Sequence, residues 1–180
     1  FFLAVLLRFI FDEKVWARWK AITPIFFLVW ANLHGGFLSG LVVMLIVIFV
    51  RSFKAKRLLV FDFMLLLVCL LATLLTPYRE LLWREVLSSI TDSTLRYRVS
   101  EWRPFLFSAD VSVGGLVGLS GGFAWAYRRK IAAEKIAVYL FFLVQAFLSN
   151  RNIPLWAISA IPVTLEGFEF FRHEIGNGKA

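Results

Sequence analysis

Long apolar runs separated by short charged segments make up most of this chain. Runs with few or no charges cover residues 1–11, 21–50, 58–76, 111–127, 136–150 and 152–165. A helix that crosses a bilayer needs about 20 mostly apolar residues. Its backbone must satisfy its own hydrogen bonds in the hydrocarbon core, so such runs form helices. The pattern therefore predicts an all-α fold, a polytopic transmembrane helical bundle, in a single domain.

The run 21–50 is too long for one straight crossing, because thirty helical residues would extend about 45 Å. Its centre carries Asn32 and His34, followed by the helix-weakening pair Gly35-Gly36. We expect the chain to turn at this pair and to cross twice. The predicted crossings then lie near 1–11, 15–34, 37–53, 58–76, 111–127, 131–149 and 153–171.

The distribution of Lys and Arg favours this turn. With a turn at Gly35-Gly36, 14 of the 20 basic residues fall on one side of the membrane and 6 on the other. A single crossing would divide them equally. Cytoplasmic loops are enriched in Lys and Arg. The charge count therefore places His34, Arg151 and a long loop over 77–110 on the extracytoplasmic face of a multi-pass protein of the cell (plasma or inner) membrane.

Hydrophobicity, net charge and cysteine content exclude several classes of protein and of site. Hydrophobic residues make up 60% of the chain and charged residues 18%, against about 45–50% and about 25% in soluble domains. The net charge of +8 is distributed between apolar runs, which excludes a nucleic-acid interface. The single cysteine, Cys69, excludes a disulfide framework and a thiolate metal cluster. Because the chain opens within an apolar run, we expect a piece of a longer protein.

Residues 80–90 have the pattern of an amphipathic helix. Leu82, Val86 and Ile90 share one stripe, while Glu80 and Arg84 lie on the opposite face. We expect this helix to lie in the membrane interface as a surface strut, which we favour over a role in substrate binding.

Two polar segments are candidate binding sites for a sugar or a phosphate. In Glu101-Trp102-Arg103, the carboxylate can accept from sugar hydroxyls, the indole can stack on a pyranose ring and the guanidinium can bind phosphate. The alternative is an aromatic interface anchor with a local ion pair. Arg151 has no carboxylate neighbour in the sequence, so it either binds an anion or extends to the interface.

His34 lies at the end of an apolar run and is one of two histidines. It either binds phosphate or exchanges protons, or it caps the turn at headgroup level. No His, Cys, Asp or Glu set has metal-ligand spacing, so we expect neither a metal nor a cofactor. A different surface is formed by Gly114, Gly118 and Gly122, whose spacing favours close packing against a partner helix.

Four segments together resemble a known family. They are 30–37 (Trp-Ala-Asn-Leu-His-Gly-Gly-Phe), Thr76-Pro77-Tyr78, Glu101-Trp102 and 151–154 (Arg-Asn-Ile-Pro). In this order and spacing they resemble a family of bacterial multi-pass membrane proteins that is similar to the C-type glycosyltransferase superfamily. Arg79 departs from the family pattern, which has glycine at this position, and the turn of this loop is therefore in question.

The resemblance implies transfer of a sugar from a polyprenyl-phosphate carrier outside the cytoplasm. His34, Arg103 and Arg151 match positions that would recognise the donor phosphate, and membrane lipids and the lipid-linked sugar would be the partners. The acidic catalytic residue of that superfamily lies in an earlier loop, and its role does not pass to Glu101. Two other classes stay open: a transporter or flippase of lipid-linked glycans, and a non-catalytic scaffold subunit. The lack of an internal repeat speaks against the transporter.

Overall fold

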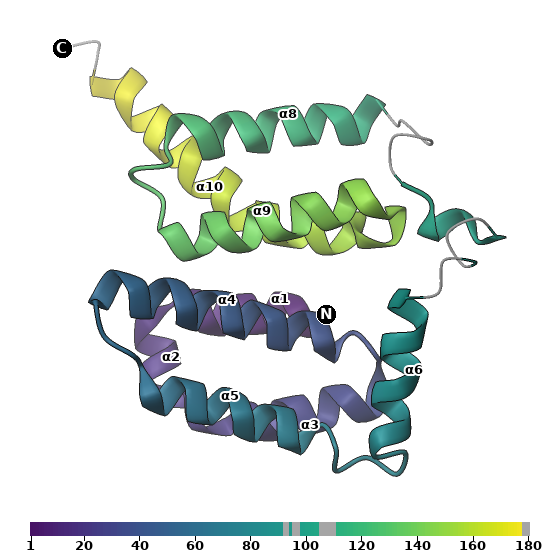
Figure 1. Ribbon diagram of the computed structural model, residues 1–180. Coiled ribbons are helices and arrows are strands. Elements are labelled where there is room, and N and C mark those ends of the chain that lie inside the picture. Colours follow the sequence, from purple (N-terminus) through teal and green to yellow (C-terminus); the bar gives the residue numbers. More distant parts are fainter. Residues whose placement is uncertain (92–93, 95–97, 105–110, 178–180) are drawn as a thin grey trace. The chain divides into compact units, whose positions relative to one another are not determined.

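The computed structural model describes residues 1–91, 94, 98–104 and 111–177. Throughout these residues the regular structure is helical, without strands, which confirms the all-α prediction (Figure 1). The sequence predicts a single domain, whereas the chain divides into two compact units, Phe1–Leu95 and Arg96–Ala180. Parts of the predicted loop over 77–110 lie outside the described residues.

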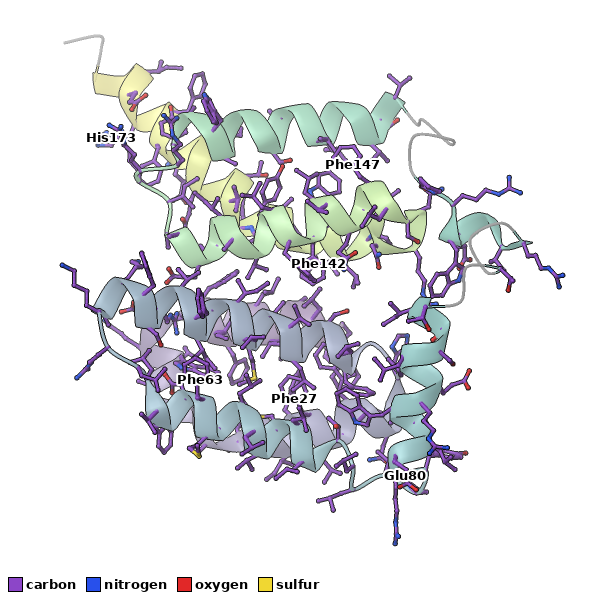
Figure 2. All side chains as sticks on the ribbon, in the orientation of Figure 1. Phe27, Phe63, Glu80, Phe142, Phe147 and His173 are labelled. Atoms are coloured by element: carbon purple, nitrogen blue, oxygen red, sulfur yellow. The ribbon has the colours of Figure 1, made fainter. Side chains whose placement is uncertain are left out.

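The first unit consists of helices that run alternately in opposite directions, with one further helix across an end (Figure 1). In this unit α3 packs on α5, and α4 contacts both α1 and α5. Phe27, which is labelled in Figure 2, is fully buried at its centre. The elements are α1 (Phe2–Phe11), α2 (Glu13–Trp19), the 3-10 turn η1 (Lys20–Ile22), α3 (Thr23–Leu33), α4 (Phe37–Ala55), α5 (Val60–Ala72) and α6 (Glu80–Thr91).

Two breaks shape the first half of this unit. The break between α3 and α4 at residues 34–36 lies where the Gly35-Gly36 pair predicts it, and the chain reverses there (Figure 1). Within the crossing predicted over 15–34, the 3-10 turn η1 separates α2 from α3. Pro24 explains this second break: it lacks a backbone N–H and lies in the first turn of α3, where a helix tolerates proline best.

In its described residues the second unit has three α-helices. They also alternate in direction (Figure 1). Its last helix packs on both of the others. The aromatic side chains of Tyr139, Phe142 and Trp156 are fully buried in this unit, and Phe142 is labelled in Figure 2. The elements are η2 (Ser100–Trp102), α8 (Val111–Ala126), α9 (Ala133–Leu148), η4 (Asn150–Asn152) and α10 (Ile153–Asn177).

One helix of the described chain, the 19-residue α4, is both long and apolar enough to span a membrane. The apolar helices α1, α5 and α8 have 10, 13 and 16 residues. A bundle of seven crossings therefore stays a prediction. The amphipathic helix predicted over 80–90 is present as α6, and it lies across the end of the first unit at which α3 and α4 join (Figure 1).

Candidate functional site

Two candidate segments that are distant in the sequence come together at one end of the second unit. The Ser149 hydroxyl donates to the backbone oxygen of Glu101 at 3.1 Å. The backbone N–H of Asn150 donates to the backbone oxygen of Arg103 at 2.9 Å. These two bonds hold η2 and the residues after it against the turn between α9 and α10.

The guanidinium of Arg151 lies over the indole ring of Trp102, with its central carbon 4.7 Å from the ring centroid. A guanidinium that stacks by its face keeps the N–H groups of its edges available for hydrogen bonding. Phosphate and carboxylate groups bind to such an edge with two parallel hydrogen bonds. The pair therefore holds the exposed Arg151 cation over an aromatic surface.

The remaining groups of this cluster are accessible. Glu101, Arg103 and Arg151 are exposed, and Trp102 is half-buried. The Asn152 side chain donates to the backbone oxygen of Gln145 at 3.2 Å, which ties η4 to the last turns of α9. A rigid turn with exposed charged side chains is an arrangement that suits ligand binding, because the backbone is fixed while the polar groups face solvent.

His34 belongs to the first unit and ends α3. Its backbone N–H donates to the carbonyl of Trp30 at 2.9 Å, and its ring Nδ1 accepts from the backbone N–H of Gly36 at 2.8 Å. This bond assigns the hydrogen of the neutral ring to Nε2. A Cβ on Gly36 would lie only 2.8 Å from Nδ1, so the close approach requires glycine. The capping interpretation of His34 is thus present in the structure, and its exposed ring leaves Nε2 able to donate.

Helix α6 closes the same end of the first unit by apolar packing. The rings of Trp83 and Phe37 are 5.4 Å apart, edge to face. The Trp83 indole N–H donates to the Thr73 hydroxyl at 3.0 Å. Next to α6, Arg79 has a φ of 45°, in the left-handed region that favours glycine. The turn therefore keeps a glycine-type conformation although it carries an arginine.

The structure brings four of the five predicted site residues together, namely Glu101, Trp102, Arg103 and Arg151. His34 lies in the other unit and is described on its own. Sequence analysis missed Ser149, whose hydroxyl bonds to a backbone atom 48 residues earlier, since no periodicity or motif signals such a contact. In the described ranges no three His, Cys, Asp or Glu side chains are close enough to share a metal ion.

Most glycines of α8 lie on an open side of the helix. A Cβ at Gly114, Gly118 or Gly122 would meet nothing within 4 Å, so this face of α8 is open. On another side of the helix the Ser120 hydroxyl lies 3.0 Å from the Tyr139 hydroxyl, and both residues are buried. The side of α8 that contacts α9 therefore includes Ser120, and the glycine face is available to a partner.

Comparison with models of protein families found no match for this chain. Searches among curated proteins and among solved structures found no match either.

Proposed function

We propose that the chain is part of a multi-pass membrane protein that binds a polyprenyl-phosphate-linked sugar and supports transfer of that sugar on the extracytoplasmic side. The observation that carries the proposal is the stacking of Arg151 on Trp102, in a turn held to Glu101 and Arg103 by two hydrogen bonds. A guanidinium edge, an indole and a carboxylate at one place match the parts of a phosphorylated sugar.

Exposed apolar side chains support the membrane part of the proposal. Helix α5 exposes a set of large hydrophobic residues, and contiguous surfaces of this kind mark contact with lipid or with another protein. Lipid contact accounts for such a set without requiring a partner for every helix. The set on α5 and just after it consists of Val60, Phe61, Met64, Leu67, Val68, Leu71 and Leu75, each about half exposed or more.

The charges of the first unit support the orientation. Eight basic residues lie at the end opposite to α6, near α2 and the end of α4, and three acidic residues accompany them. At the α6 end, Arg79 and Arg84 are balanced by Glu80 and Glu85. Positive charge collects on the cytoplasmic side of membrane proteins, which puts α6 and His34 on the other side. The basic set is Arg8, Lys14, Arg18, Lys20, Arg51, Lys54, Lys56 and Arg57.

In this function the residues of the cluster have distinct roles. Arg151 and Arg103 bind the phosphate and stabilise the negative charge that develops on it as the sugar leaves. Glu101 accepts hydrogen bonds from sugar hydroxyls, and Trp102 provides a flat surface for the ring. The base that activates the acceptor hydroxyl is supplied from outside this cluster.

Binding of radiolabelled polyprenyl phosphate to the protein in vesicles tests the proposal. We expect Arg151→Ala to weaken binding at least tenfold, because the stacked guanidinium is lost. Arg84→Ala is the matched control and should bind like the wild type, since Arg84 is an exposed arginine that stacks on no indole of the described residues. Extraction of the vesicles with carbonate at high pH checks that both variants stay inserted. Equal affinities of the wild type and Arg151→Ala would contradict the proposal.

A scaffold function is a second candidate, and the open glycine face of α8 favours it. In that case Gly118→Leu abolishes co-purification with the partner while Arg151→Ala leaves it intact. Under the sugar-transfer function, Arg151→Ala weakens binding of the lipid-linked phosphate, whereas Gly118→Leu leaves that binding intact.

A further inference from the structure

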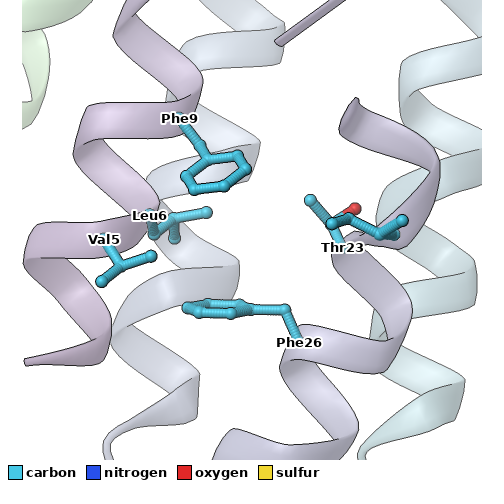
Figure 3. Close-up of a pocket in the computed structure, with 6 residues that line it drawn as sticks. Val5, Leu6, Phe9, Thr23 and Phe26 are labelled. Carbon is cyan, nitrogen blue, oxygen red and sulfur yellow. The ribbon is translucent and has the colours of Figure 1, made fainter. Parts of the chain in front are cut away.

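The space between α1 and α3 in the first unit (Figure 3) is small, with a volume of about 40 Å³. Apolar atoms line it, and the one polar side chain beside it, Thr23, donates its hydroxyl hydrogen to the Lys20 carbonyl at 2.6 Å. The volume is far below the roughly 300–1,000 Å³ of ligand pockets, so the space is a packing gap. The turn between α3 and α4 is different, because its polar groups bond to one another in a way that depends on charge.

The hydrogen bond that closes this turn is made by a neutral imidazole. The Nδ1 atom of His34 accepts from the backbone N–H of Gly36 at 2.8 Å. Gly36 is the N-cap of α4, and the N–H groups at a helix start have no partner within the helix. Histidine Nδ1 can accept only while the ring is neutral, because both nitrogens of the charged ring carry hydrogen. Protonation of His34 therefore breaks this bond.

The charged ring cannot keep this contact. A Cβ on Gly36 would lie 2.8 Å from Nδ1 and 3.2 Å from the ring carbon Cε1, so the ring lies directly against the backbone of Gly36. A hydrogen on Nδ1 would then face the N–H hydrogen of Gly36. Two donors that face each other at this distance repel, and either the ring moves away or the turn changes.

The charged ring has a favourable place close by. His34 is the C-cap of α3, and the C-terminus of a helix carries partial negative charge, which stabilises a cation there. The last carbonyl groups of a helix also lack partners within it and can accept hydrogen bonds. The ring thus has two places: at the start of α4 when it is neutral, and at the end of α3 when it is charged.

Among the described residues, no charged group of the neighbouring elements bonds to the His34 ring. From α3, the Asn32 amide donates to the Leu28 carbonyl at 2.8 Å. From α6, the methyl carbon Cγ2 of Val86 lies 3.4 Å from the position of a Cβ on Gly35. The charged side chains of α1, α4 and α5 lie toward the opposite end of the unit. The titratable groups at this end are all on exposed residues: the amino group of Phe1, and Tyr78, Arg79, Glu80, Arg84 and Glu85.

We propose that the turn between α3 and α4 is a pH-sensitive device controlled by His34. The neutral ring holds the N–H of Gly36 and fixes the start of α4. The charged ring releases Gly36 and pairs with the end of α3. Histidine is the side chain that ordinarily changes charge between about pH 5 and 8. The release takes place next to the contact of Gly35 with Val86, and so loosens the turn on which α6 packs. The device depends neither on sugar transfer nor on the membrane placement.

Exchange of the Gly36 amide hydrogen with solvent tests this device, measured by NMR on the isotope-labelled protein in detergent at about pH 8 and about pH 5. Protection is the exchange rate of an unfolded chain at the same pH, divided by the rate in the protein. We expect protection in the wild type to be about fivefold stronger at the higher pH. His34→Asn places Oδ1 at the position of Nδ1, accepts the same bond and does not titrate, so it should keep the protection at both pH values. His34→Ala should lose it at both.

His173→Gln is the matched control, because His173 is the other histidine of the chain, and it should behave like the wild type. Circular dichroism at both pH values checks that the helices stay folded, so that a change at Gly36 is local. Equal protection of Gly36 in the wild type at both pH values would overturn the proposal, and so would a loss of protection of His34→Asn in acid. None of these variants changes Arg151, so the polyprenyl phosphate assay and this one fail independently.

Discussion

Different contacts hold the polar turns of the two units, although both units are built from helices that alternate in direction. In the first unit, α6 packs at the end beside His34 through Trp83, which contacts Phe37 and donates a hydrogen bond to the buried Thr73. In the second unit, η2 and η4 hold each other by backbone bonds and leave Arg151 exposed on Trp102. Both turns expose a polar side chain, His34 in the first unit and Arg151 in the second, but a packed helix stabilises the first turn and backbone hydrogen bonds hold the second.

The basic ends of the units differ in a second way. In the second unit, Lys130 bonds to Glu174 at 2.7 Å and Lys135 bonds to Glu166, so carboxylates of α10 compensate these cations. In the described part of the first unit, Lys14 and Arg18 of α2 form no ion pair with a carboxylate, whereas Lys20 of η1 pairs with Asp62 of α5 at 2.6 Å. The contrast between the units therefore concerns the cations of α2.

The largest expected effect separates a packed glycine, Gly40 in α4, from an open glycine, Gly118 in α8. A Cβ at Gly40 would overlap the buried Trp30 ring and approach Phe27 to 3.0 Å. We expect Gly40→Ala to lower the free energy of unfolding by about 1–3 kcal/mol. Gly118→Ala meets open space and should raise it by about 0.5–1 kcal/mol, because alanine favours a helix. Chemical denaturation in detergent measures both; equal effects would contradict the described packing.

Removal of a paired and an unpaired cation should sharpen the second comparison. The side chains of Lys135 and Glu166 are 16% and 30% exposed, so the loss of Lys135 leaves a carboxylate in a partly buried place. We expect Lys135→Gln to cost about 1–2 kcal/mol, between the values for exposed and buried pairs. Lys14→Gln should cost less than about 0.5 kcal/mol. A larger cost for Lys14→Gln would show that this residue has a structural role.

The end of the first unit beside α6 can be weakened by removing a single hydrogen bond. Trp83→Phe keeps most of the ring packing and removes the bond from the indole N–H to Thr73. We expect a loss of about 1 kcal/mol in the free energy of unfolding, with polyprenyl phosphate binding unchanged. Ser149→Ala should cost a similar amount and also weaken that binding, since the bond to the Glu101 backbone positions the cluster. If both variants affected binding alike, the two turns would not differ as we propose.

The smallest expected effect is a dependence of stability on pH, through Glu174. The hydrogen bond from Lys130, followed by that from Tyr127, lowers the pKa of Glu174 below its usual value. A carboxyl whose folded pKa is depressed stabilises the fold above its unfolded pKa, and this contribution is lost as the pH falls through the folded pKa. Glu174→Gln should therefore lower Tm at pH 7, and the difference from the wild type should vanish at acidic pH. A difference that persists below the folded pKa would assign it to packing.

Asp12 provides the corresponding test in the first unit. Its pKa is lowered, first by the backbone N–H of Val15 and then by Arg8. Asp12→Asn keeps an N-cap side chain and removes the charge. Its melting curve should approach that of the wild type at acidic pH, as for Glu174→Gln.

The sequence predicts several of the helices and some of their ends. Apolar runs, the Gly35-Gly36 pair and the stripe of Leu82, Val86 and Ile90 predict segments that the structure contains as α3, α4 and α6. These features are local, because helix periodicity and turn residues act over a few positions. The sequence also contains a signal for the break at η1, because Pro24 precedes an apolar run and marks a helix start.

The site was only partly accessible from the sequence. Residue types suggested Glu101, Trp102, Arg103 and Arg151, but their assembly depends on bonds from Ser149 and Asn150 that join segments 47 or 48 residues apart. Such contacts follow from how α9 and α10 pack, which no local pattern encodes. The two-unit division lacked a signal as well, because composition does not change between the units.

Thiol labelling from the two sides of the membrane tests the central claim most directly. In a Cys69→Ser background, single cysteines replace Ala17 in α2, Ser52 at the end of α4, and Ser88 on the exposed side of α6. We predict that Ala17→Cys and Ser52→Cys react only with reagent on the cytoplasmic side, and Ser88→Cys only with reagent outside. Labelling of Ala17→Cys and Ser88→Cys from the same side would contradict the account.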